Sequence, residues 1–194
     1  MRQTLTLFAC VVVIGVSVAA GQQPPAAPPA PPAAPQAAPT LVAEVQTTFN
    51  AIKGNITKAA AQFPEDKNLW QPTPLVRSWA RLIAHVADDN NGACSVLVGM
   101  PRPARLDTED SQNSGANKMT KADLEKALGD SFALCDKAFA AVTEANMMER
   151  NGTRSKIGTL IYDTSHINEH YGNIVTYMRL NNLVPPSTAA RGGK

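Results

Sequence analysis

The feature that most constrains the fold is the return of apolar residues every three or four positions from Leu41 onward, in four separate stretches. This spacing places the apolar side chains along one face of a helix. No stretch shows the alternation of a half-buried strand, so the sequence predicts an all-α fold in which the helices pack on one another as a four-helix bundle. The expected helices cover residues 41–63, 79–99, 120–146 and 155–180.

Residues that start or end helices mark the limits of these stretches. Pro64 ends the first helix because proline lacks an amide proton and clashes with the preceding turn. Ser78 is placed to cap the second helix, and Thr120 with Asp123 three residues later has the form of a capping box for the third. The polar segment 101–119 between these helices is unusually long, which permits a crossover connection.

The first twenty residues have the pattern of an export signal. Arg2 precedes an apolar stretch that begins at Leu5, and small residues follow at Ala19 and Ala20. A membrane anchor is the alternative, but the apolar run falls short of the roughly 20 residues of a spanning helix and no basic cluster follows it. We therefore expect a signal peptide at 1–20 and a periplasmic or secreted protein without a stable membrane anchor.

The remainder divides into a linker, one domain and a tail. Residues 21–39 are rich in proline and alanine and uncharged, which predicts an extended polyproline-type linker. We expect one domain at residues 40–188 and a flexible tail at 189–194. The chain has 18 Lys and Arg against 16 Asp and Glu, so nothing indicates binding to nucleic acid.

The chain has three histidines, and their spacing predicts a metal site. His166 and His170 are one turn apart on the fourth helix, about 40° apart on the helical wheel, so both imidazoles can reach one ion. His85 lies at the edge of the apolar face of the second helix, in a similar position to the other two. Three imidazoles with open coordination positions suit zinc or nickel, and the alternative is three boundary side chains that bind nothing.

Several polar residues fall near these histidines on the helical wheels. Glu169 turns away from them and is expected to face solvent. Four others are candidates to orient the ligands or to line a groove: Asp89, Thr159, Asp163 and Tyr177. No cluster of basic residues that would hold an anionic cosubstrate is visible in the second or fourth helix.

The segment from His166 to His170 also fits the HxxEH pattern of inverted zinc proteases, which is the main alternative metal chemistry. Those enzymes take a further ligand from a carboxylate downstream. No Asp or Glu follows Glu169, so the pattern argues against a protease.

Cys94 lies about 180° around the second helix from His85 and is not expected to bind the metal. If the second and third helices run parallel, Cys94 and Cys135 stand at similar heights, and an oxidising compartment could join them. The alternative that we favour from the sequence is two buried thiols that behave as small apolar side chains.

Two segments resemble a known family. HINEHYGNIVTYMRLNNLVPPS, which starts at His166, resembles the last helix of the DinB/YfiT-like metalloenzymes, and SWARLIAHVADDNN around His85 resembles their second helix. The resemblance covers roughly residues 41–188. It implies a four-helix bundle of up-down-down-up order, which would explain the long 101–119 connection, and it places the family's metal-binding histidines on His85, His166 and His170.

The resemblance also implies a class of reactions, because relatives are thiol-dependent transferases and isomerases. We expect a divalent-metal-dependent enzyme of the thiol-transferase or hydrolase type that acts on a small molecule, with a thiol as one candidate. One alternative is an exported metal- or ligand-binding module without turnover, and another is a helical interaction domain whose histidines have lost their role. The oligomeric state stays open, with a homodimer among the alternatives.

Overall fold

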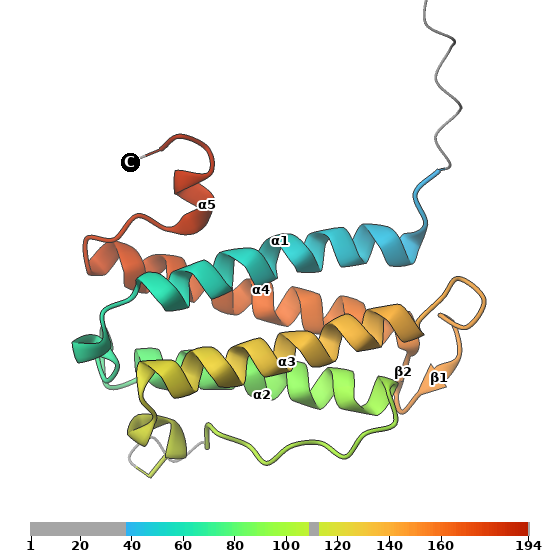
Figure 1. The fold of residues 1–194 in the computed structure, drawn as a ribbon, viewed down its shortest axis with the longest axis horizontal. Helices are drawn as coiled ribbons and strands as arrows, with labels where there is room; N and C mark the ends of the chain where they lie inside the picture. Colours follow the sequence, from blue (N-terminus) through green and yellow to red (C-terminus); the bar gives the residue numbers. More distant parts are fainter. Residues whose placement is uncertain (1–37, 109–112, 194) are drawn as a thin grey trace, which may run out of the picture. The chain divides into compact units, whose positions relative to one another are not determined.

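Four long helices form most of the structure, a computed structural model that describes residues 38–108 and 113–193 (Figure 1). The expected signal peptide and the linker up to Ala37 lie outside the described residues. The long helices are α1 (Leu41–Gln62), α2 (Trp79–Leu97), α3 (Lys121–Ala141) and α4 (Lys156–Leu180). Shorter elements are the 3-10 helices Glu65–Lys67 and Gly115–Lys118, strands β1 (Arg150–Asn151) and β2 (Arg154–Ser155), and helix α5 (Pro186–Ala189).

Each long helix begins at a residue whose side-chain oxygen accepts a hydrogen bond from a backbone amide of the first turn. These capping residues are Thr40, Ser78, Thr120 and Ser155. Thr120 and Asp123 form the complete capping box expected from the sequence. The mostly helical architecture confirms the predicted all-α class.

The region after α3 differs from the sequence-based expectation. The helix ends at Ala141 rather than near Asn146, because Val142 has an extended backbone and the Asn146 side chain accepts a hydrogen bond from the amide of Thr143. Two-residue strands β1 and β2 then pair antiparallel around Gly152, which has a φ of 65°. The expectation that strands are absent was therefore wrong for these four residues.

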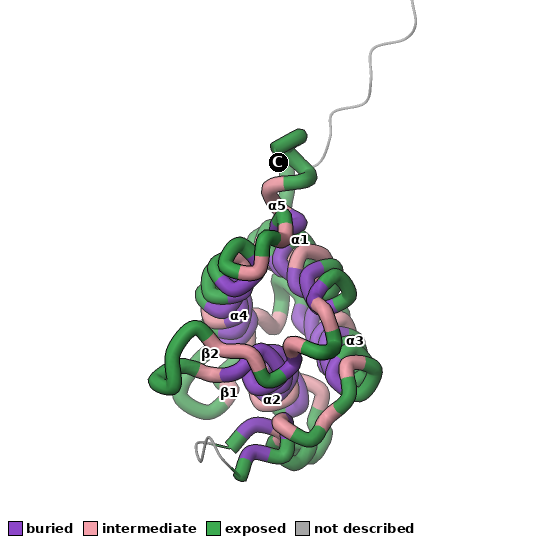
Figure 2. The backbone as a smooth tube through the Cα atoms, turned by 90° about the vertical axis from the view of Figure 1, so that its left-hand side faces the viewer, coloured by how far each residue is buried: buried purple, intermediate pink, exposed green. Residues whose placement is uncertain are grey.

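The long helices surround a common core. Side-chain pairs along α2 and α3 keep the same order, from Ser78 with Asn117 near the helix starts, through Asn90 with Ser131, to Cys94 with Cys135, so the two helices run parallel. Buried positions face the space between the helices (Figure 2). Contacts between aromatic rings fill this core, including Phe49 with Phe132 and Phe139, and Phe63 stacked on Trp79.

A disulfide joins Cys94 of α2 to Cys135 of α3, and both residues are fully buried. The Cα atoms are 5.0 Å apart, as parallel neighbouring helices allow. The interpretation of the two cysteines as free buried thiols was therefore wrong.

Two buried carboxylates hold the 101–119 connection against α2. Asp88 accepts hydrogen bonds from the amides of Leu106 and Asp107. Asp107, which is 1% exposed, accepts hydrogen bonds from Arg77 at 2.9 Å and Arg81 at 2.7 Å. The described part of this connection is thus anchored by charges, although its sequence has no apolar periodicity.

None of the helices in the described chain is both long enough and apolar enough to cross a membrane.

Candidate metal centre

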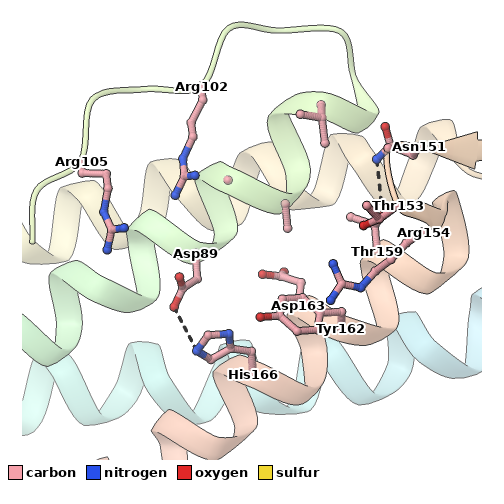
Figure 3. Close-up of a pocket in the computed structure, with 14 residues that line it drawn as sticks. Asp89, Arg102, Arg105, Asn151, Thr153, Arg154, Thr159, Tyr162, Asp163 and His166 are labelled. Atoms are coloured by element: carbon pink, nitrogen blue, oxygen red, sulfur yellow. Dashed lines mark hydrogen bonds and ion pairs between the residues drawn. The ribbon is translucent and has the colours of Figure 1, made fainter.

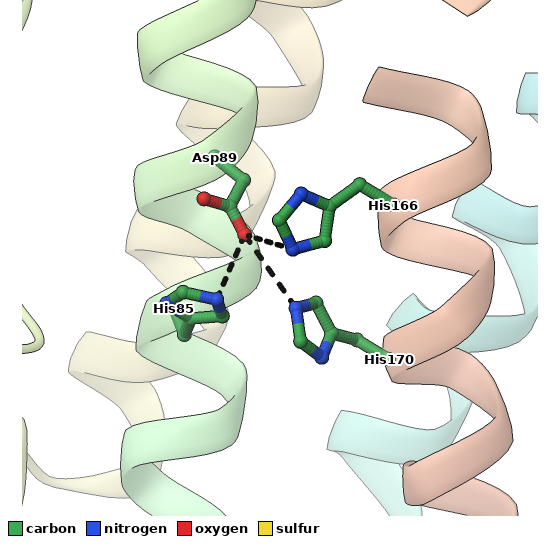
Figure 4. Close-up of side chains that lie close together, drawn as sticks. All are labelled: His85, Asp89, His166 and His170. Atoms are coloured by element: carbon green, nitrogen blue, oxygen red, sulfur yellow. Dashed lines mark ion pairs between the residues drawn. The ribbon is translucent and has the colours of Figure 1, made fainter. Parts of the chain in front are cut away.

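The three histidines come together between α2 and α4 (Figure 4). The ring centroids of His85 and His170 are 4.6 Å apart, and those of His166 and His170 are 4.7 Å apart. The rings of His85 and His166 are 5.8 Å apart. The structure therefore gathers all three predicted ligands into one cluster, across two helices that are distant in sequence.

Asp89 completes this cluster. Its Oδ2 atom lies 3.1 Å from Nε2 of His85, 3.6 Å from Nε2 of His166 and 3.7 Å from Nε2 of His170. The four candidate ligand atoms all lie within 4.8 Å of one another. The sequence suggested Asp89 only as a supporting residue, whereas its carboxylate faces the histidines directly.

Several polar atoms of the cluster are buried without a hydrogen-bond partner in the described protein: Asp89 Oδ2, His85 Nδ1, and both ring nitrogens of His170. Buried polar atoms ordinarily have partners, since leaving one unpaired costs about 1–3 kcal/mol. Imidazole nitrogens and a carboxylate oxygen that converge in this way fit a divalent ion such as zinc. The cluster can thus hold a metal ion, and the donor set does not identify which one.

The surroundings keep two of the imidazoles neutral. Burial lowers the pKa of His85 to about 3, and the positive charges of Arg77 and the other histidines add to the shift. Burial and His166 lower the pKa of His170 to about 4. Neutral imidazole is the form that binds a metal, so these two side chains need not lose a proton at neutral pH to act as ligands.

Asp107 lies on the Nδ1 side of the His85 ring. Its Oδ2 atom is 3.8 Å from Nδ1 of His85. This distance is too long for a hydrogen bond, but the nearby negative charge favours a proton on Nδ1, which would leave Nε2 free for a metal. Sequence reasoning missed Asp107, because it belongs to a connection whose path over α2 has no local signal.

The remaining candidates have different positions. Thr159 accepts a hydrogen bond from Asn151, and Glu169 is exposed, as expected. The Tyr177 hydroxyl donates to the backbone carbonyl of Arg77 rather than to a histidine. Oδ2 of Asp163 lies 3.9 Å from Sγ of Cys94 and 3.8 Å from Sγ of Cys135, so Asp163 packs on the disulfide rather than behind a histidine.

A pocket of about 520 Å³ opens beside the cluster, and Asp89 and His166 form part of its wall (Figure 3). This volume falls within the range of about 300–1,000 Å³ typical of small-molecule sites. Three arginines line the pocket: Arg102, Arg105 and Arg154. These arginines lie outside α2 and α4, in the 101–119 connection and in β2, so the lack of a basic cluster on the two helices gave no sign of them.

Comparison with known proteins agrees with this architecture. A conserved protein from Enterococcus faecalis has a similar solved structure, with a TM-score of 0.61 and 18% sequence identity over 74% of this chain and 98% of that chain. At this identity the likeness concerns the fold alone. No curated protein sequence matches the chain. Residues 49–174 match the sequence model of the DinB superfamily, which covers more than half of the chain. The chain therefore belongs to the DinB superfamily.

Proposed function

We propose that this protein is a metal-dependent enzyme of the thiol-transferase or hydrolase type, with His85, His166 and His170 as ligands of zinc or nickel. Asp89 is the fourth candidate ligand. The observation that carries the proposal is the convergence of three Nε2 atoms on one carboxylate oxygen, in a place where that oxygen and both nitrogens of His170 lack hydrogen-bond partners among the described residues.

When bound, a divalent ion would lower the pKa of a coordinated water or thiol, which supplies a nucleophile at neutral pH. Residues of the protein would then orient the metal ligands and bind the substrate. Asp107 places a negative charge 3.8 Å from Nδ1 of His85, and the pocket next to His166 offers room for a small-molecule substrate. A closed structural zinc site would have no reason to adjoin such a pocket, so this feature supports an enzyme.

Export is part of the proposal and has two supports. The first twenty residues have the pattern of a signal peptide. The Cys94–Cys135 disulfide fits an oxidising compartment, since disulfides persist in secreted and periplasmic proteins and are rare in the cytosol.

The first experiment counts metal. The protein is purified without a metal-affinity tag, incubated with zinc or nickel, desalted, and analysed by mass spectrometry. We expect about one ion per chain in the wild type and close to none in His166→Ala. Glu169→Gln is the matched control, because this exposed side chain lies between the two histidines in sequence and should leave the count unchanged. A wild type that stays empty, or a His166→Ala protein that still holds one ion, would refute the site.

The second experiment separates an enzyme from a binding module. The metal-loaded protein is assayed with small thiols plus alkylating electrophiles, and separately with activated esters and amides. Turnover that disappears in His166→Ala supports the enzyme and identifies its type. Metal binding without turnover in any of these assays favours a metal- or ligand-binding module.

A further inference from the structure

Three arginines from two separate segments line the pocket beside the histidine cluster. Arg102 and Arg105 reach it from the 101–119 connection, and Arg154 reaches it from β2 on the opposite side (Figure 3). The same pocket is lined by Asp89 and His166. A group held by these arginines would therefore lie next to the candidate metal ligands.

The residues that the structure describes compensate the charges of these arginines only in part. Arg102 donates a hydrogen bond to the backbone carbonyl of Asp88 at 3.2 Å, and the guanidinium of Arg154 lies 3.9 Å from the centre of the Tyr162 ring. Neither forms an ion pair with any residue that the structure describes. Arg105 forms one ion pair among the described residues, with Asp88 at 4.0 Å, whose carboxylate already accepts hydrogen bonds from the amides of Leu106 and Asp107. The charge of Arg105 also acts on Asp89.

Two acidic residues, Asp89 and Asp163, also line the pocket, against three arginines. The carboxylate of Asp89 is directed at the histidines. Burial raises the pKa of Asp163 to about 7, so a large share of this side chain is neutral at physiological pH. The pocket thus presents an excess of positive charge to a ligand.

Gly92 lets one of these arginines lie close to α2. A Cβ atom at position 92 would come within 2.8 Å of Cζ and Nη2 of Arg102. This is closer than carbon atoms approach without displacement, so any larger residue would push the guanidinium away. Because Gly92 has no side chain, the guanidinium of Arg102 can lie directly against α2 at this position.

We propose that this pocket binds the oxyanion of a small molecule, a carboxylate or a phosphate ester, between Arg102, Arg105 and Arg154. The inference deepens the proposed function, because it assigns that site an anionic substrate or cosubstrate. Guanidinium groups suit this role, since their planar array of N–H donors matches the two oxygens of a carboxylate or phosphate. The volume of about 520 Å³ leaves space for an organic group attached to the anion.

Isothermal titration calorimetry on the purified, metal-free protein tests the inference with three probes of similar size: phenyl phosphate, benzoate and the neutral benzyl alcohol. We expect binding of at least one anion and none of the alcohol. Arg102→Gln and Arg154→Gln should each weaken anion binding about tenfold or more, as loss of a charge-assisted hydrogen bond does. Gly92→Ala should weaken it as well, because it displaces Arg102 without changing the charge.

Arg150→Gln is the matched control, because this exposed arginine lies on the neighbouring strand and outside the pocket wall; it should change the affinity less than about twofold. Binding of only one anion identifies a phosphate ester or a carboxylate as the ligand. The inference is overturned if neither anion binds, if benzyl alcohol binds equally well, or if Arg150→Gln weakens binding as much as the pocket variants.

Measured side by side on the wild type, metal uptake and anion binding separate this inference from the metal proposal. A wild type that takes up no metal but binds phenyl phosphate or benzoate through the arginines would refute the metal proposal alone. A wild type that holds one ion per chain but binds neither anion would refute the pocket assignment alone.

Discussion

The carboxylate of Asp89 lies 3.1 Å from Nε2 of His85, one turn earlier on α2, and the same oxygen faces the two histidines of α4. One helix thus contributes both a nitrogen and an oxygen to the cluster, at positions i and i+4. Burial raises the pKa of Asp89, because its negative charge has lost contact with water. A bound divalent ion would stabilise the negative charge of Asp89 in place of the water that burial removes.

Asp89→Asn should therefore weaken metal binding without removing the site. The amide has the same shape but no charge, while the three histidines stay in place. We expect the affinity for zinc to fall about 10- to 100-fold, in the range seen when groups that support a metal site are lost. Competition with a chromophoric chelator measures the affinity. An affinity equal to that of the wild type would show that Asp89 is not a ligand.

Asp163→Asn should change the pH dependence of stability. The pKa of Asp163 is raised from 3.8 to about 7, chiefly by burial, so between about pH 4 and pH 7 the folded protein keeps a proton that the unfolded chain has lost. This group therefore makes the wild type less stable as pH rises through that window, by up to about 1.4 kcal/mol per pH unit. The asparagine variant should gain stability relative to wild type from pH 4 to pH 7, with no further gain above.

Urea denaturation of metal-free protein at several pH values measures this difference. His85 and His170, whose pKa values are lowered, change wild-type stability in the opposite direction. They are present in both proteins, so the comparison between variant and wild type isolates Asp163. Asp130→Asn on the exposed surface of α3 is the control. A difference between Asp163→Asn and wild type that stays constant over the window would contradict the assigned shift.

Asp107→Asn should destabilise the fold. Hydrogen bonds from Arg77, Arg81 and Ser114 hold the pKa of Asp107 below its usual range despite burial, so the side chain is charged at neutral pH. Removing the charge leaves Arg81, which is 6% exposed, without its buried partner. We expect a loss of about 3–5 kcal/mol in the free energy of unfolding.

Urea denaturation at pH 7 measures this loss, and Asp66→Asn, an exposed residue of the first 3-10 helix, serves as the control. If Asp107→Asn costs no more than the control, the buried ion pairs do not anchor the connection.

Cys94→Ala combined with Cys135→Ala should reveal the contribution of the disulfide. The two cysteines are 41 residues apart, and closing a loop of this size lowers the entropy of the unfolded chain by an amount worth about 4 kcal/mol at 25 °C. The double variant should lose roughly that much in urea denaturation. Adding a reductant should lower the stability of the wild type and leave that of the double variant unchanged. A double variant as stable as the oxidised wild type would show that the disulfide does not stabilise the fold by restricting the unfolded chain.

The long helices could be predicted from the sequence because their signals are local. Ser78, Thr120 and Ser155 cap the helices that they were expected to start. The apolar spacing likewise placed His85 at the edge of the core, where the structure brings it to the histidines of α4. The end of α3 was misjudged, because Val142 continues the apolar pattern and is buried although its backbone has left the helix.

The rest of the site depends on contacts between distant segments. Asp107 reaches His85, and Arg102 reaches the pocket, only because buried carboxylates hold the 101–119 connection along α2. Nothing in the composition of that connection indicates its path. The disulfide likewise depends on the relative heights of two helices, which the sequence could suggest but could not fix.

The position of the disulfide has a consequence for how the protein would respond to proteolysis. Cys94 and Cys135 lie on either side of the connection that carries Arg102 and Arg105. The crosslink makes the intervening chain a covalent ring, so one cut in it would give two peptides that remain a single molecule until reduced. In a compartment rich in proteases, a nicked copy would keep α2 fastened to α3.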